Sequence, residues 1–276
     1  MRNQRGTMGP SPVRRAVDAD PEHAFAPLPG AALPATGVLR SPHVPAPSSP
    51  SFHSGSRSVL TPRDLPRFAG DALFDKVARV VCEASCLPRK ELYESWEVAR
   101  RTRRRFRGGR VWDLAAGHGL LGHLLLVLDD SSPSAVCVDT QVSGSQQPLA
   151  AALVAHWPRL AGRVQRRQGD LVGIEAGPED LVVSAHACGA LSDRVIDVTL
   201  RARARLALLP CCHDKETCDA GALGGWMDVS LAVDATRVAR LRAAGYDVFT
   251  QSIPEAITPK NRLLLAAPRG AKAPGA

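Results

Sequence analysis

The chain has 276 residues, a formal net charge of +8 and 45% hydrophobic residues. This length holds one large α/β domain with extra segments, and the basic charge favours acidic partners. No apolar run is long enough to cross a bilayer, which excludes a membrane-spanning protein. The seven cysteines follow no secretory segment, so we expect reduced thiols and a cytoplasmic protein.

Residues 1–66 differ in composition from the rest of the chain. Ten of the 22 prolines fall in the first 50 residues, serines cluster around Ser48, and no apolar periodicity is present. Such a segment cannot bury enough apolar surface to offset the entropy of ordering. We therefore predict a disordered tail over 1–66, and a short flexible tail over 271–276.

A helical, basic extension is predicted over residues 67–108. Its helical pattern begins near Asp71, is broken at Pro88 and ends in a cluster of arginines. Such a cluster suits the phosphates of a nucleic-acid backbone, and the alternative is a solvated face paired with nearby glutamates. The arginines predicted to contact RNA are Arg100, Arg101, Arg103, Arg104, Arg105 and Arg107.

The segment over 111–119 contains a short apolar strand that leads into a glycine turn. Leucines at helical spacing follow from Leu120. The turn has the form D-x-A-x-G-x-G, and glycines permit a close backbone approach that a Cβ would obstruct. This pattern predicts a site for an adenosine-containing cofactor, formed by Asp113, Ala115, Gly117 and Gly119.

Polar side chains stand at the ends of the following strands. Asp139 comes 26 residues after Asp113, near the offset at which an acidic residue meets ribose hydroxyls. Asp170 ends the third strand, where it could reach an adenine amine, and Ser184, also predicted to bind the cofactor, ends the fourth. The alternative is that these residues are helix caps or turn residues. Three acids at successive strand ends favour a bound cofactor.

Strands and helices alternate along the domain predicted over 109–270. Further strands are predicted at 134–139, 163–170, 180–184 and 204–209, with helices at 146–157, 192–203 and 229–244. This alternation predicts a parallel sheet with right-handed crossovers. Residues 246–253 and 261–267 leave no room for a helix between them and must pair antiparallel. The predicted fold is Rossmann-like α/β, with a mostly parallel seven-stranded sheet closed by an antiparallel hairpin.

Two loops of this architecture resemble a family of class I methyltransferases. His186–Gly189 follows the fourth strand and Leu209–His213 follows the fifth. They are similar to the H-x-C-G and C-C-[HY] loops of eukaryotic enzymes that methylate a ribose hydroxyl of tRNA. They also resemble methyltransferase-like and glutathione-transferase-C-terminal-domain-containing proteins. The resemblance spans about 73–268 and implies binding of S-adenosyl-L-methionine (SAM) and methyl transfer, with a substrate that differs among members.

The same loops supply two candidate bases. The fourth strand lacks the Asn/Asp-Pro-Pro-Tyr/Phe motif with which amine methyltransferases hold a nitrogen. A hydroxyl acceptor needs a proton acceptor as it attacks, and imidazole suits that task near neutral pH. We therefore predict His186 and His213 as catalytic residues, with simple loop hydrogen bonding as the alternative for each.

The cysteines of these loops raise the question of a metal. Cys188, Cys211, Cys212, Cys218 and His213 could gather around one zinc. However, no C-x2-C pair is present, and the adjacent Cys211 and Cys212 are expected to point in different directions. We therefore expect no metal, and small thiols that line a pocket.

Together these features favour a SAM-dependent methyltransferase with RNA, tRNA included, as the preferred substrate. A small-molecule methyltransferase is one alternative, which a deep closed pocket would favour. A SAM-binding or RNA-binding protein without catalysis is another, left open by Ala115 and the absent amine motif.

Overall fold

The computed structural model describes residues 52–141, 144 and 146–270, so most of the predicted tails lies outside the described residues. Residues 52–66, predicted as part of the first tail, pack against the domain. Leu60 is fully buried, and a short helix, η1 (Pro62–Phe68), follows it. The amide of Thr61 donates to the carboxylate of Asp64 at 3.1 Å, which fixes the start of η1. The predicted boundary at residue 66 is therefore too late.

Seven strands form one sheet in the order β3-β2-β1-β4-β5-β7-β6. Strands β1 to β5 run parallel, β7 is antiparallel to β5 and to β6, and β6 is thus parallel to the first five. This confirms the predicted Rossmann-like sheet with its closing hairpin. The strands are β1 (Val111–Leu114), β2 (Ala135–Asp139), β3 (Val164–Gln168), β4 (Leu181–Ser184), β5 (Arg205–Leu208), β6 (Tyr246–Ser252) and β7 (Arg262–Pro268).

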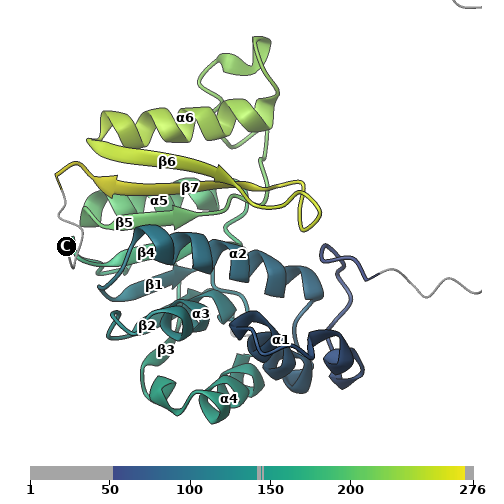
Figure 1. Ribbon diagram of the computed structural model, residues 1–276. Coiled ribbons are helices and arrows are strands. Elements are labelled where there is room, and N and C mark those ends of the chain that lie inside the picture. Colours follow the sequence, from purple (N-terminus) through teal and green to yellow (C-terminus); the bar gives the residue numbers. More distant parts are fainter. Residues whose placement is uncertain (1–51, 142–143, 145, 271–276) are drawn as a thin grey trace, which may run out of the picture. The chain divides into compact units, whose positions relative to one another are not determined.

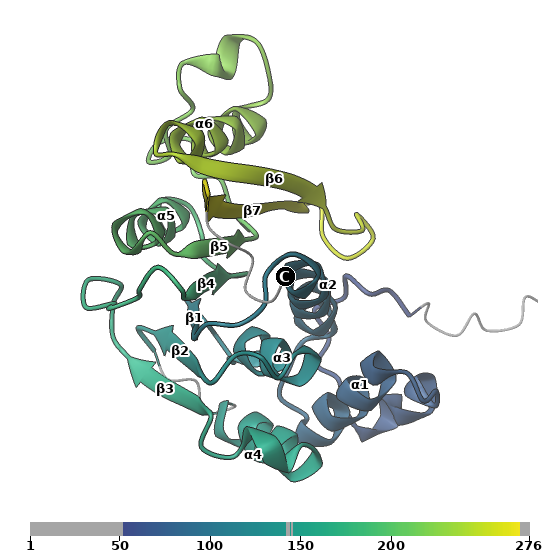
Figure 2. The ribbon, with the colours of Figure 1, turned by 60° about the vertical axis from the view of Figure 1, so that its left-hand side comes forward.

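Helices cover both faces of the sheet (Figures 1 and 2). One face carries α1 (Leu73–Ala84), α2 (Arg89–Arg105), α3 (Leu120–Leu128) and α4 (Gln146–His156). The other carries α5 (Leu191–Ala202) and α6 (Val229–Ala243), and short turns η2 (Pro158–Leu160) and η3 (Leu223–Gly225) complete the elements. No helix in the described part of the chain is long and apolar enough to span a membrane.

The alternation of side chains along each strand creates two separate cores. In β1, Val111 packs with α1 to α4, whereas Trp112 and Leu114 pack with α5 and α6. In β5, Ala207 belongs to the first core and Leu206 to the second. Because both faces are buried, the central strands are continuous apolar runs, as expected for a parallel sheet.

The basic extension contains two helices that meet at the predicted break. Helix α1 ends before Ser85, whose φ of 50° is left-handed, and α2 begins directly after Pro88. Proline pre-sets the backbone for a helix start and cannot continue the preceding helix. Helix α2 then crosses one face of the sheet, and its N-terminal turn lies at the edge where the parallel strands end (Figure 1).

Candidate active site

The glycine turn between β1 and α3 has a left-handed backbone at three positions. The φ angles are 51° at Ala115, 53° at Gly117 and 75° at Gly119. Glycine adopts such angles freely, whereas Ala115 bears a strain of about 1 kcal/mol. A Cβ at Gly119 would lie 3.3 Å from the sulfur of Cys137. The predicted turn is present, with a strained alanine in place of its first glycine.

Asp139, at the end of β2, meets this turn. Its Oδ2 accepts a hydrogen bond from the amide of Gly117 at 2.9 Å, and its Oδ1 accepts from the amide of Gln141 at 3.2 Å. The side chain amide of Gln146 in α4 donates to the carbonyl of Gly117. A small pocket beside this contact is lined by Ala115, Val138, Asp139, Thr140, Gly169, Asp170, Leu171, Leu191 and Arg194. The structure thus places three of the predicted cofactor residues, Ala115, Asp139 and Asp170, around one pocket.

Two other predicted cofactor residues are buried and hold the backbone. Asp113 is 1% exposed, and its Oδ2 accepts from the amide of Gly122 in the first turn of α3 at 2.9 Å. Burial raises the pKa of Asp113 to about 7 despite this hydrogen bond. Ser184 is fully buried, and its Oγ accepts from the amide of Ala187 at 3.2 Å. Asp113 thus stabilises the start of α3, and Ser184 stabilises the loop after β4, through these hydrogen bonds to backbone amides.

A group of polar side chains gathers on the other side of the turn. His186 is half-buried, and its ring carbon Cδ2 would lie 3.8 Å from a Cβ at Gly117. Nδ1 of His118, within the turn, lies 2.7 Å from Oε2 of Glu91 in α2. Burial by itself raises the pKa of Glu91, but the hydrogen bond from His118 and the nearby imidazole of His186 lower it below its usual value. Glu91 therefore carries a negative charge beside two histidines.

His213, the second predicted base, lies in a buried ion-pair network. Its side chain is 2% exposed, and its Nε2 lies 2.7 Å from Oδ1 of Asp234 in α6. Asp234 also accepts from Arg262 at 2.6 Å and from Arg237 at 3.4 Å. Nδ1 of His213 is buried without a hydrogen-bond partner among the described residues. This arrangement favours the alternative interpretation for His213, a structural loop contact.

The thiols of the two signature loops lie together. The sulfur atoms of Cys188, Cys211 and Cys212 are all within 4.8 Å of one another. The expectation that Cys211 and Cys212 point in different directions is therefore wrong, because both side chains bring their sulfur atoms to the same place beside Cys188. Cys218 is buried elsewhere, where its sulfur accepts a hydrogen bond from Arg237 at 3.6 Å.

The arginines at the end of α2 differ in their exposure and in their partners. Arg103 is 4% exposed and donates to the carbonyl of Leu125 and the hydroxyl of Ser132, so its predicted phosphate contact is wrong. Arg100 and Arg101 pair with Glu97. Burial lowers the pKa of Arg103 to about 10. The remaining members, Arg104, Arg105 and Arg107, are exposed, and the guanidinium of Arg105 stacks over Phe249.

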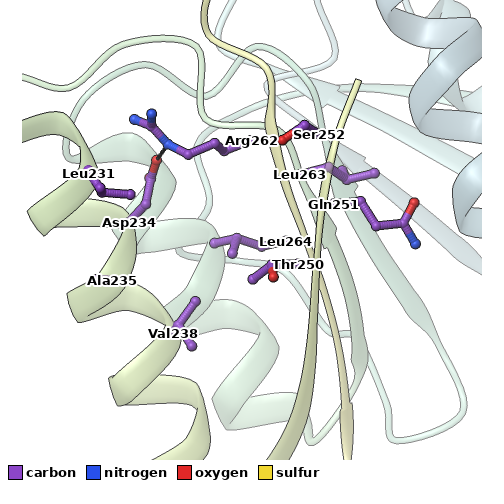
Figure 3. A pocket seen from close by; sticks show the side chains of 10 residues that line it. All are labelled: Leu231, Asp234, Ala235, Val238, Thr250, Gln251, Ser252, Arg262, Leu263 and Leu264. Atoms are coloured by element: carbon purple, nitrogen blue, oxygen red, sulfur yellow. Dashed lines mark hydrogen bonds and ion pairs between the residues drawn. The ribbon is translucent and has the colours of Figure 1, made fainter. Parts of the chain in front are cut away.

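A larger pocket, of about 340 Å³, lies between α6 and the β6–β7 hairpin (Figure 3). Its lining residues all come from these three elements, and the Asp234–Arg262 ion pair stands at one end. The residues of the glycine turn do not line it. This pocket is therefore separate from the predicted cofactor site.

Residues 90–219 match a family model described as a methyltransferase domain. The match starts at the first turn of α2 and includes the glycine turn, Asp139 and both cysteine loops. It agrees with the methyltransferase class that the resemblance implied and does not distinguish the sub-group. A search of curated proteins found no match.

Several solved structures are similar to this chain. They include B. subtilis TrmK, a tRNA m1A22 methyltransferase, at 17% identity over 64% of this chain and 65% of that chain, with a TM-score of 0.44. M. capricolum TrmK in complex with S-adenosyl-homocysteine matches at 14% identity over 64% of this chain and 68% of that chain, with a TM-score of 0.41. An O-methyltransferase family protein from Burkholderia thailandensis matches at 20% identity over 79% and 66%, with a TM-score of 0.41. Similarity at this level carries no information on the substrate.

Sequence reasoning missed Glu91, His118, Gln146 and Arg194 as site residues. Glu91 and Arg194 lie on helices whose packing against the turn is a tertiary contact without a local sequence signal. His118 lies within the glycine turn itself, and its position between Gly117 and Gly119 was a usable signal.

Proposed function

We propose that the chain is a SAM-dependent methyltransferase that methylates a hydroxyl group of RNA. The observation that carries this proposal is that His186 lies close to Gly117, in the turn whose Ala115 lines the pocket at Asp139. A candidate cofactor pocket and an imidazole side chain thus both lie beside one glycine turn. The match to a methyltransferase domain supports the same reaction class.

The residues present fit the proposed cofactor. The carboxylate of Asp139 would accept hydrogen bonds from ribose hydroxyls, and Gly117 and Gly119 would leave room for the chain of the cofactor along the backbone. Asp170 and Arg194 would border the adenine. When bound, SAM supplies an electrophilic methyl group on a positively charged sulfur.

His186 would act as the base in this reaction. Its imidazole would accept the proton of the attacking hydroxyl, which develops a positive charge on the ring. Glu91, held ionised by His118, would stabilise that charge because opposite charges in a half-buried site attract strongly. The chain itself thus supplies a proton acceptor and a counter-charge, whereas methyl transfer to nitrogen mainly needs positioning.

RNA is the proposed acceptor because exposed arginines at the other end of α2 could hold a long, negatively charged molecule whose acceptor group lies at this site. Arg104 is 13 residues from Glu91 along α2, which corresponds to about 20 Å of helix. The side chain of Arg107 is 67% exposed. An acceptor that reaches both the turn and these arginines must be a macromolecule with spaced negative charges, which describes a phosphate backbone.

The proposal is tested by transfer of tritium-labelled methyl groups from SAM to total RNA. We expect label in RNA that is released by ribonuclease, and calorimetric binding of SAM and of its demethylated product. Label in small metabolites but not in RNA would contradict the RNA acceptor. If the protein neither binds SAM nor transfers a methyl group, the proposal of a SAM-dependent methyltransferase would be contradicted.

A further inference from the structure

We propose that Cys188, Cys211 and Cys212 form a zinc-binding site with an open fourth position. This inference does not depend on the proposed methyl transfer, because it rests on the placement of three thiols at the carboxyl edge of β4 and β5. Their sulfur atoms already lie within 4.8 Å of one another. The sequence-based expectation of no metal rested on the missing C-x2-C pair and on diverging side chains of Cys211 and Cys212, and the second reason is removed by the structure.

The spacing of the thiols is close to what zinc requires. Zinc–sulfur bonds of about 2.3 Å at tetrahedral angles place the sulfur atoms about 3.8 Å apart. The thiols therefore need to move by no more than about 1 Å to reach bonding positions around one ion. Side chain rotation in two loops can supply such a movement without a change in the sheet.

The two loops are joined to each other before any metal binds. Strands β4 and β5 pair directly, with Ser184 opposite Leu208. Beyond the strands, the amide of Gly189 donates to the carbonyl of Cys212 at 3.2 Å. One hydrogen bond thus links the loop that carries Cys188 to the loop that carries the other two cysteines.

A buried arginine on α6 fixes the same loops from outside. Arg237 is 1% exposed, and it donates to the carbonyl of Gly189 at 3.0 Å and to the carboxylate of Asp193 at 2.7 Å. Its neighbour Asp234 holds His213, which directly follows Cys212. Outer contacts of this kind orient ligand side chains and reduce the ordering cost of metal binding.

Exposure of the cluster fits an open site. Cys188 and Cys212 are exposed and Cys211 is half-buried, so an ion could enter and one coordination position would face solvent. Three protein ligands with a fourth position taken by water or substrate is the arrangement of zinc sites that act in catalysis, whereas structural sites are closed by four protein ligands.

The first experiment titrates the reduced, untagged full chain with Co²⁺ and Zn²⁺. We expect one ion per chain, with thiolate-to-cobalt charge transfer and the visible bands of tetrahedral Co²⁺, both abolished by Zn²⁺. Cys188→Ser, Cys211→Ser and Cys212→Ser should each weaken binding about 100-fold or more. Cys86→Ser is the control, since Cys86 is half-buried between α1 and α2 and should leave binding unchanged. Equal binding by all four variants would overturn the proposal.

A second measurement uses the unmodified chain, so that a variant which fails to fold does not decide the outcome. Alkylation of the reduced protein, followed by peptide mass spectrometry, reports the reactivity of each thiol. Zn²⁺ should protect Cys188, Cys211 and Cys212 from alkylation and leave the labelling of Cys86 unchanged. Labelling that is the same with and without Zn²⁺, or protection of all cysteines alike, would overturn the proposal.

Discussion

Oε2 of Glu91 lies 2.7 Å from Nδ1 of His118, and this contact joins the helical extension to the glycine turn. Glu91 belongs to the first turn of α2, whereas His118 stands between the two glycines that precede α3. The extension is therefore part of the candidate site. Loss of the charge on Glu91 should affect chemistry at the turn even though Glu91 lies outside the Rossmann-like sheet.

Glu91→Gln should lower the rate of methyl transfer about tenfold, because the substitution removes the counter-charge for a protonated imidazole. The affinity for SAM, measured by calorimetry, should change little. Glu83→Gln is the matched control, since Glu83 is exposed on α1. Equal losses of SAM affinity and rate in Glu91→Gln would indicate instead that the contact only shapes the turn.

His186→Ala and His213→Ala should have opposite effects on rate and stability. Removal of the base at His186 should lower turnover about 10²–10⁴-fold with little change in melting temperature. Removal of His213 should cost about 1–3 kcal/mol of unfolding free energy, because Asp234 loses a buried partner. Denaturant melts and turnover across pH 6 to 9 separate the two. Full turnover of His186→Ala would shift the role of base to His213 or indicate an amine acceptor.

Asp139→Ala should lower SAM affinity about 10-fold to 100-fold, since hydrogen bonds to a charged acceptor contribute about 1.5–3 kcal/mol. The loss includes the bond that Asp139 accepts from the amide of Gly117, which shapes the turn. Asp247→Ala serves as control, because Asp247 lies on β6 beside Arg269. Calorimetric curves that are identical for both variants would remove Asp139 from the cofactor site.

Arg104 and Arg103 should respond differently to substitution although they are neighbours. Arg104→Glu combined with Arg107→Glu should weaken RNA retention and flatten its salt dependence while the fold is retained. Arg103→Ala should destabilise the protein by about 3 kcal/mol, because Leu125 and Ser132 lose a buried donor. Filter binding at several salt concentrations and thermal melts report the two effects. An unchanged salt slope in the double variant would argue that these arginines form only a solvated surface.

Acid should destabilise the protein through His123. This residue is 1% exposed, Nδ1 contacts the carbonyl of Gly119 at 2.7 Å, and burial lowers its pKa from 6.5 to about 4. A lowered pKa means that the unfolded chain binds a proton more readily, so the contribution is complete above pH 6.5 and is lost as the pH falls towards about 4. The loss amounts to about 3 kcal/mol.

The matched variant for this pH effect is His123→Leu, which has no titrating group at the position. Urea unfolding between pH 4 and 7 should show a smaller pH dependence in His123→Leu than in the unaltered chain. Parallel curves for the two proteins would contradict the assignment to His123.

The sheet could be predicted from the sequence because each central strand is a separate apolar run between polar loops. The predicted strand at 180–184, for example, corresponds to β4 (Leu181–Ser184), whose four residues are all buried. Such runs report burial on both faces, which is a local property. The antiparallel pairing of the last two strands followed from the absence of a helix between them.

The site could be predicted only in part. The burial of Arg103 had a usable signal, since it continues the helical stripe of Ser95, Ala99 and Thr102, whose members are all buried. The Glu91–His118 contact had none, because it depends on how α2 packs. The meeting of Cys211 with Cys212 depends on backbone angles in an irregular loop, which residue types alone do not determine.

The position of β7 in the sheet sets an order for folding during synthesis. Strand β7 is the last in the sequence, yet it lies between β5 and β6. Until residue 268 has left the ribosome, β5 therefore presents an apolar, unpaired edge, and β6 has no strand to join. Unpaired edges of this kind bind other chains readily. A nascent chain that stalls before β7 would therefore be prone to aggregation. Arg262, the first residue of β7, would also be missing, so Asp234, which contacts His213 beside the cysteines, would lack its ion pair with Arg262.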